Sequence, residues 1–92
     1  MKVHELLSAP DRWTQGAAAR RVDESCTDPR DPEAVSWCLA GAIMRCYDNP
    51  GEHWFVVEKV TEELSTSCIL AWNDHQGRTW KEVIELAQRV DI

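Results

Sequence analysis

The most continuous apolar run of the chain is Ser36–Met44, near its middle. Asp31-Pro32 precedes the run as a helix N-cap followed by proline at the first helical position, and Asp48-Asn49-Pro50-Gly51 follows it as a stop. The pattern therefore predicts a central helix over about residues 32–47, covered by neighbours on most of its sides. One stripe of this helix has a period of 3.6 residues and consists of Val35, Leu39, Ala42, Ile43 and Cys46.

Weaker apolar stripes predict further helices at residues 3–8, 52–65 and 79–90. In the second of these, Trp54, Val57 and Val60 are expected to face the core. Thr79 and Glu82 have the spacing of a capping box at the start of the third.

Two segments are less clear. The run 68–72 is too short to distinguish a buried strand from a helical turn, and we favour a short helix because no partner strand is evident. Residues 13–22 fit either a helical turn or an extended arm that carries Trp13 into the core. The expected fold is an all-α single domain over residues 1–92, a bundle of four to five short helices around the buried helix at 32–47.

Composition narrows the possible partners. Sixteen acidic and ten basic residues give a net charge of −6, so the chain lacks the basic face that direct binding to nucleic acid requires. An acidic protein is better suited to a basic protein partner. No run approaches the roughly 20 apolar residues of a membrane span, and the first residues are too polar for a secretory signal. We expect a cytoplasmic protein with reduced cysteines, whose five tryptophans supply core and part of a contact surface.

The cysteines do not form a recognisable chemical motif. Structural zinc sites usually contain ligand pairs separated by about two to four residues, whereas the nearest two cysteines, Cys38 and Cys46, are eight positions apart. Cys38 lies between Trp37 and Leu39, where burial disfavours a reactive thiolate. We therefore predict no metal site, no cofactor and no catalytic residue.

Three polar segments remain as candidate binding sites. Two are acidic, and they would form one carboxylate patch, similar in charge to a phosphate backbone, if the fold brought them together. The third is the loop after Trp72, which either forms side-chain turn hydrogen bonds or holds an acid/base pair. The candidate residues are Asp23, Glu24 and Asp28 in the first segment, Glu58, Glu62 and Glu63 in the second, and Asn73, Asp74, His75 and Arg78 in the third.

Three motifs together carry a resemblance to a known group of proteins. They are W-x-Q-G-x-x-A-R from Trp13, W-C-L-x-G-A from Trp37 and W-N-D-x-x-G-R-T-x-x-E-V from Trp72. With these motifs the chain resembles a family of small, functionally uncharacterised proteins from bacteria and their phages. The resemblance implies a bacterial or phage-infected cell as the setting, and it implies no activity.

Small size, acidity and the absence of catalytic motifs lead to a non-enzymatic interaction protein as the main hypothesis. In its sharpest form this is a phage or mobile-element inhibitor that binds the basic surface of a host nucleic-acid machine, as anti-restriction and anti-CRISPR proteins do. One alternative is a small enzyme or ligand-binding domain that uses the Asp74, His75 and Arg78 loop. Another is a plain helical oligomerisation module.

Overall fold

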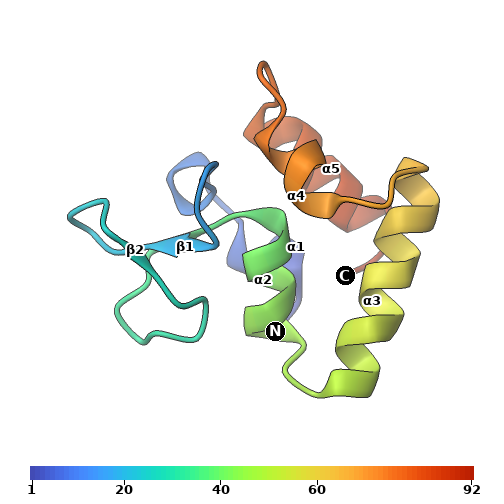
Figure 1. Cartoon of the computed structure of the whole chain (residues 1–92), viewed down its shortest axis with the longest axis horizontal. Coiled ribbons are helices and arrows are strands. Elements are labelled where there is room, and N and C mark those ends of the chain that lie inside the picture. The colour runs from blue at the N-terminus through green and yellow to red at the C-terminus, as the bar shows by residue number, and fades with distance from the viewer.

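A three-stranded antiparallel sheet lies at one end of the molecule (Figure 1). In the computed structural model, which describes residues 1–92, the central strand β1 (Ala19–Arg20) pairs with β2 (Cys26–Thr27) on one side and with β3 (Ser36–Trp37) on the other. The expected all-α fold is therefore wrong, because the chain combines helices with a sheet. Of the two alternatives for residues 13–22, the extended one is correct.

The expected central helix is only half present. Helix α2 runs from Leu39 to Cys46, and the segment before it is turn and strand because the backbone of Ser36–Trp37 is paired with β1. Asp31 does not cap a helix; its carboxylate accepts a hydrogen bond from the Glu33 backbone N–H at 2.9 Å and closes a turn. The N-cap of α2 is Cys38, whose Sγ accepts from the backbone N–H of Gly41 at 3.2 Å.

The other expected helices are present, with shifted ends. Asn49 caps the longest of them, α3 (Pro50–Leu64), by accepting from the backbone N–H groups of Gly51 and Glu52. The capping box of Thr79 and Glu82 at the start of α5 is confirmed. The remaining elements are α1 (Val3–Leu6), a 3₁₀ turn η1 (Pro10–Arg12), α3 (Pro50–Leu64), α4 (Ile69–Asp74) and α5 (Trp80–Arg89). None of these helices has both the length and the apolar character that crossing a membrane demands.

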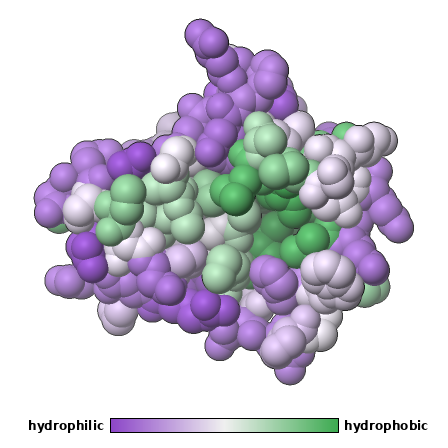
Figure 2. All heavy atoms as spheres, viewed as in Figure 1, coloured by the Kyte–Doolittle hydropathy of each residue, from purple (hydrophilic) through white to green (hydrophobic).

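Helix α2 forms the centre of the core, in contact with α1, α3 and α4. Its residues Leu39, Ala42 and Ile43 are completely buried. Burial of a leucine or isoleucine side chain contributes about 1.5–3 kcal/mol to stability, so the short helix is held by packing rather than by its own length. In Figure 2 the apolar atoms on this face gather where α2, α3 and α4 meet.

Gly41 allows the chain before β1 to lie directly on α2. A Cβ atom at this position would stand 2.0 Å from the carbonyl oxygen of Ala18. The same carbonyl accepts a hydrogen bond from the Cys38 backbone N–H at 3.1 Å. Only glycine leaves room for this contact, which joins the sheet to the helical part of the molecule.

Candidate functional site

The three sequence motifs meet at the side chain of Asn73 in α4, which is completely buried. Its Oδ1 accepts from the indole N–H of Trp13 at 2.7 Å and from the backbone N–H of Leu39 at 2.9 Å. Its Nδ2 donates to the Thr14 carbonyl at 3.1 Å. One amide therefore links the extended arm, the start of α2 and the end of α4.

Neighbouring motif residues complete this Asn73 junction. Gln15 Nε2 donates to the backbone carbonyls of Asn73 at 2.9 Å and His75 at 3.2 Å. The Asp74 carboxylate accepts from the backbone N–H of Gly16 at 3.1 Å. Gly16 has a φ of 79°, a left-handed conformation that favours glycine. The polar groups of the Trp13 and Trp72 motifs are thus engaged with each other.

Arg78 is also held in place within the chain. Its Nε donates to the Trp72 carbonyl at 2.9 Å, its Nη1 donates to Glu82 at 2.8 Å, and its guanidinium stacks over the Trp72 ring at 4.0 Å from the centroid. The backbone hydrogen bond from Thr79, followed by the Arg78 interaction, lowers the pKa of the Glu82 carboxyl.

Residues 74–77 of the 73–78 loop project from the fold as an exposed hydrophilic tip, while Asn73 is buried beneath it (Figures 1 and 2). Neither of the two cavities of the molecule includes a residue of this loop. Asn73, Asp74 and Arg78 are occupied by the hydrogen bonds that hold the fold, while the His75 side chain is exposed. The geometry therefore assigns the three engaged residues a structural task.

The first acidic segment covers residues 23–33, here called the 23–33 loop, and contains the two-residue strand β2. Its acidic residues shape turns. Asp23 accepts from the backbone N–H of Ser25 at 3.0 Å and from its hydroxyl at 2.6 Å, and the hydroxyl contact is the main reason that the pKa of Asp23 is lowered. Asp28 accepts from the backbone N–H of Arg30 at 2.8 Å. Glu24 adopts a φ of 72°, and its carboxylate has no hydrogen-bond partner.

The acidic residues of α3 are less engaged. Glu63 pairs with Arg89 at 2.6 Å, whereas the carboxylates of Glu58 and Glu62 take part in no ion pair or hydrogen bond. Helix α3 and the 23–33 loop lie at opposite ends of the longest axis (Figure 1). The two acidic segments therefore do not form the single carboxylate patch considered from the sequence.

Helix α3 buries Val60 as expected, but it does not bury the whole predicted stripe of Trp54, Val57 and Val60. Val56 and Val60 face the core, and Trp54 and Phe55 are 64% and 63% exposed. The prediction that Trp54 packs inward is wrong. Sequence reasoning could not find this aromatic pair, because the stripe that contains Trp54 and the stripe that contains Val56 both have helical spacing.

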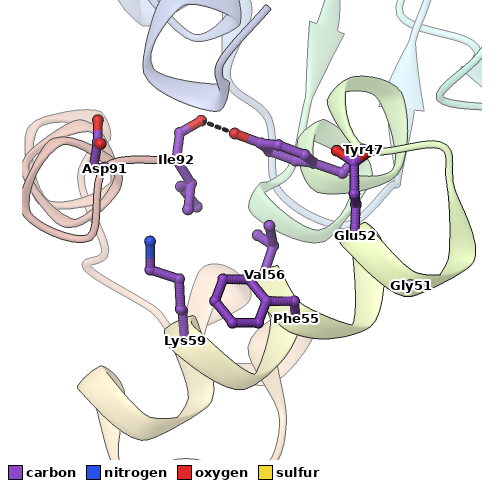
Figure 3. Close-up of a pocket in the computed structure, with 8 residues that line it drawn as sticks. All are labelled: Tyr47, Gly51, Glu52, Phe55, Val56, Lys59, Asp91 and Ile92. Atoms are coloured by element: carbon purple, nitrogen blue, oxygen red, sulfur yellow. Dashed lines mark hydrogen bonds between the residues drawn. The ribbon is translucent and has the colours of Figure 1, made fainter.

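A cavity lies on each side of the exposed aromatic pair. The first, of about 350 Å³, is bounded by α3 and the end of the chain, and the Tyr47 hydroxyl beside it donates to the Ile92 carbonyl at 2.9 Å (Figure 3). The Lys59 side chain reaches into this cavity, and its Nζ atom lies 5.9 Å from the centroid of the Phe55 ring. The second, an open groove of about 460 Å³, is lined by Trp54, Val57, Glu58, Thr61, Glu62, Ser65, Thr66 and Ser67.

The cysteines and the acidic residues offer no metal centre. No group of three or more His, Cys, Asp or Glu side chains is arranged to hold an ion. All four cysteines are free thiols. Burial raises the pKa of Cys38 and Cys46, so both thiols are protonated at neutral pH and are poor nucleophiles.

Comparison with known proteins gives one match. The model of DUF6197, a family of unknown function, matches residues 1–90. None of the curated proteins and none of the solved structures compared with the chain matches it. The expected resemblance to an uncharacterised family is thereby confirmed.

Proposed function

The chain belongs to the DUF6197 family, whose function is unknown, and we propose that it is a non-enzymatic protein-binding domain that contacts a basic partner through α3. The observation that carries this proposal is the exposed pair Trp54 and Phe55 beside two carboxylates, Glu58 and Glu62, that have no partner in the fold. We call these four residues the α3 surface.

Exposed aromatic side chains support a contact role. Leaving a large apolar side chain in water forgoes about 1.5–3 kcal/mol of burial energy. Single exposed apolar residues are common, but an adjacent aromatic pair with a cavity on either side is typical of an interaction site. Tryptophan and other aromatic residues also contribute strongly to binding energy at protein interfaces.

The charge of α3 favours a basic partner. Within this helix, Glu52, Glu58, Glu62 and Glu63 outnumber the only lysine, Lys59. Such a helix repels nucleic acid and attracts a basic protein surface, and the attraction speeds association. A second copy of this chain would bring the same negative helix against it, which disfavours self-association through this face.

The cellular role that we propose is inhibition. Basic surfaces that bind DNA or RNA are an obvious target for an acidic contact helix, and the motif resemblance to bacterial and phage proteins provides such a setting in the cytoplasm. The sharp form of the proposal is thus an inhibitor of a host nucleic-acid machine, comparable in strategy to anti-restriction and anti-CRISPR proteins.

The test is capture of partners from bacterial lysate at about 50 mM and about 500 mM salt, followed by affinity measurement on the captured protein. Screening at the higher salt should weaken binding at least about tenfold. Glu58→Lys/Glu62→Lys should abolish capture, whereas Glu24→Lys/Glu33→Lys, with the same charge change at the far end of the molecule, should retain it. A complex indifferent to salt and to the α3 reversal would overturn the proposal.

A further inference from the structure

The groove beside α3 has a regular chemical arrangement. Trp54, Glu58 and Glu62 follow one another at four-residue spacing, so they form a row along one side of the helix. Val57 and Thr61 line the groove beside this row, and residues 65–67 close its end. The groove thus combines an exposed aromatic ring, two free carboxylates and a polar end.

This combination matches the chemistry of a guanidinium group. A guanidinium is flat and charged, stacks on an indole ring, and carries five N–H donors that fit carboxylates in pairs. An ammonium group is a compact point charge without a stacking face, so lysine fits the same row less well.

Elsewhere in the molecule, an arginine already lies between a tryptophan ring and a glutamate in the same way. Arg78 stacks on Trp72 at 4.0 Å and donates to Glu82 at 2.8 Å. The α3 groove presents the same two kinds of group, an indole and a glutamate, but no arginine of the chain occupies it.

A second copy of the chain is a poor source of that arginine. Each of the seven arginines already donates a side-chain hydrogen bond within its own fold: Arg12, Arg20, Arg21, Arg30, Arg45, Arg78 and Arg89. We therefore take a different protein, rather than a second copy of the chain, as the source of the arginine. The other cavity is less suited to a cation, because of its two carboxylates Asp91 already pairs with Lys2, and Glu52 shares the cavity with Lys59.

We propose that the α3 groove binds an arginine side chain of a basic protein partner, with Trp54 stacking on the guanidinium, Glu58 one turn away accepting its hydrogen bonds, and Glu62 adding negative charge further along the groove. The inference rests on the proposed function and deepens it, because it names the residue type that the partner presents.

The experiment measures binding of fluorescein-labelled hexapeptides by anisotropy. Three peptides are identical except for two central positions, which are arginine, lysine or the uncharged isostere citrulline. The arginine peptide should bind at least about fivefold more tightly than the lysine peptide, since only a guanidinium both stacks and forms paired hydrogen bonds. The citrulline peptide should bind most weakly, because it lacks the charge.

Substitutions in the chain test whether the arginine peptide binds in the α3 groove. Trp54→Ala and Glu58→Gln/Glu62→Gln should each weaken the arginine peptide about tenfold, and Trp54→Phe should weaken it less. Glu24→Gln/Glu33→Gln removes the same charge far from the groove and should change affinity less than about twofold. Thermal unfolding of each variant verifies that it is folded, as expected for substitutions at exposed side chains.

The outcomes separate the two proposals. Equal binding of the arginine and lysine peptides, or binding unaffected by Trp54→Ala, would overturn the arginine site. If partner capture nevertheless depended on salt and on the α3 charges, the proposed function would stand without the arginine site. If no peptide bound and capture were indifferent to salt, both proposals would fail.

Discussion

The Asn73 junction and the α3 surface contain similar residues in opposite situations. Both combine tryptophan with polar or charged side chains. At the junction every such group has a partner within the chain, and no buried side-chain polar atom of the molecule lacks one. On α3, Trp54 is exposed and the carboxylates of Glu58 and Glu62 have no partner. The most distinctive sequence motif therefore holds the fold, whereas the less distinctive helix keeps side chains that no other part of the chain engages.

The largest expected effect on stability comes from Asn73→Ala. The variant leaves two donors without a partner, the part-buried Trp13 indole N–H and the buried Leu39 backbone N–H, and an unsatisfied buried group costs about 1–3 kcal/mol. We expect a loss of about 3–5 kcal/mol in the free energy of unfolding, measured by urea denaturation.

The matched change on α3 is Glu58→Gln, which should alter the same free energy by less than about 0.5 kcal/mol because the side chain is exposed and unpaired. Similar losses for both variants would remove the distinction between the two regions.

Substitution of two separate glycines should give the next largest difference in stability. In Gly41→Ala the new methyl group meets the Ala18 carbonyl at 2.0 Å, so the arm must move away from α2 at a cost of about 1–3 kcal/mol. In Gly51→Ala the nearest atom is 3.3 Å away, at the exposed start of α3, and the higher helix propensity of alanine should offset the contact. Thermal unfolding curves compare the two, and an undisturbed Gly41→Ala protein would contradict the tight contact.

The smallest expected effect is the pH dependence of stability that Glu82 contributes. The hydrogen bond from Thr79 and the Arg78 interaction lower the pKa of Glu82 from its ordinary 4.5, so its stabilising contribution is complete above that value. The contribution is lost as pH falls through the lowered folded-state pKa. Melting temperatures measured from pH 6 to pH 3 should therefore fall slightly less steeply for Glu82→Gln than for the unaltered chain. A steeper fall in the variant would reverse the assigned sign.

Local signals in the sequence were sufficient to predict the presence of helices α1, α3 and α5. The Thr79 and Glu82 capping box predicts the start of α5 because cap and partner lie three residues apart. The sheet was not predictable in this way. Each of its strands has two residues, too few to show the alternation that identifies a strand, and the Asp31-Pro32 pair looks like a helix start although it closes a turn.

The candidate site depended on contacts between distant residues. Asn73 and Trp13 are 60 positions apart, and no local pattern indicates that the loop motif and the first motif share one hydrogen-bond network. The exposure of Trp54 is likewise a tertiary outcome, since α3 has two apolar stripes and the rest of the fold covers only one. The acidic residues of α3 were identified as binding candidates from the sequence, and their role remains a proposal.

The proposed function requires binding on α3 and not on the 73–78 loop. It is tested most directly by measuring the affinity of the captured partner at low salt for Trp54→Ala and His75→Ala, two substitutions at exposed side chains. We expect at least about tenfold weaker binding for Trp54→Ala, as for an aromatic residue at the centre of an interface, and unchanged binding for His75→Ala. Full binding by Trp54→Ala together with a loss in His75→Ala would contradict it.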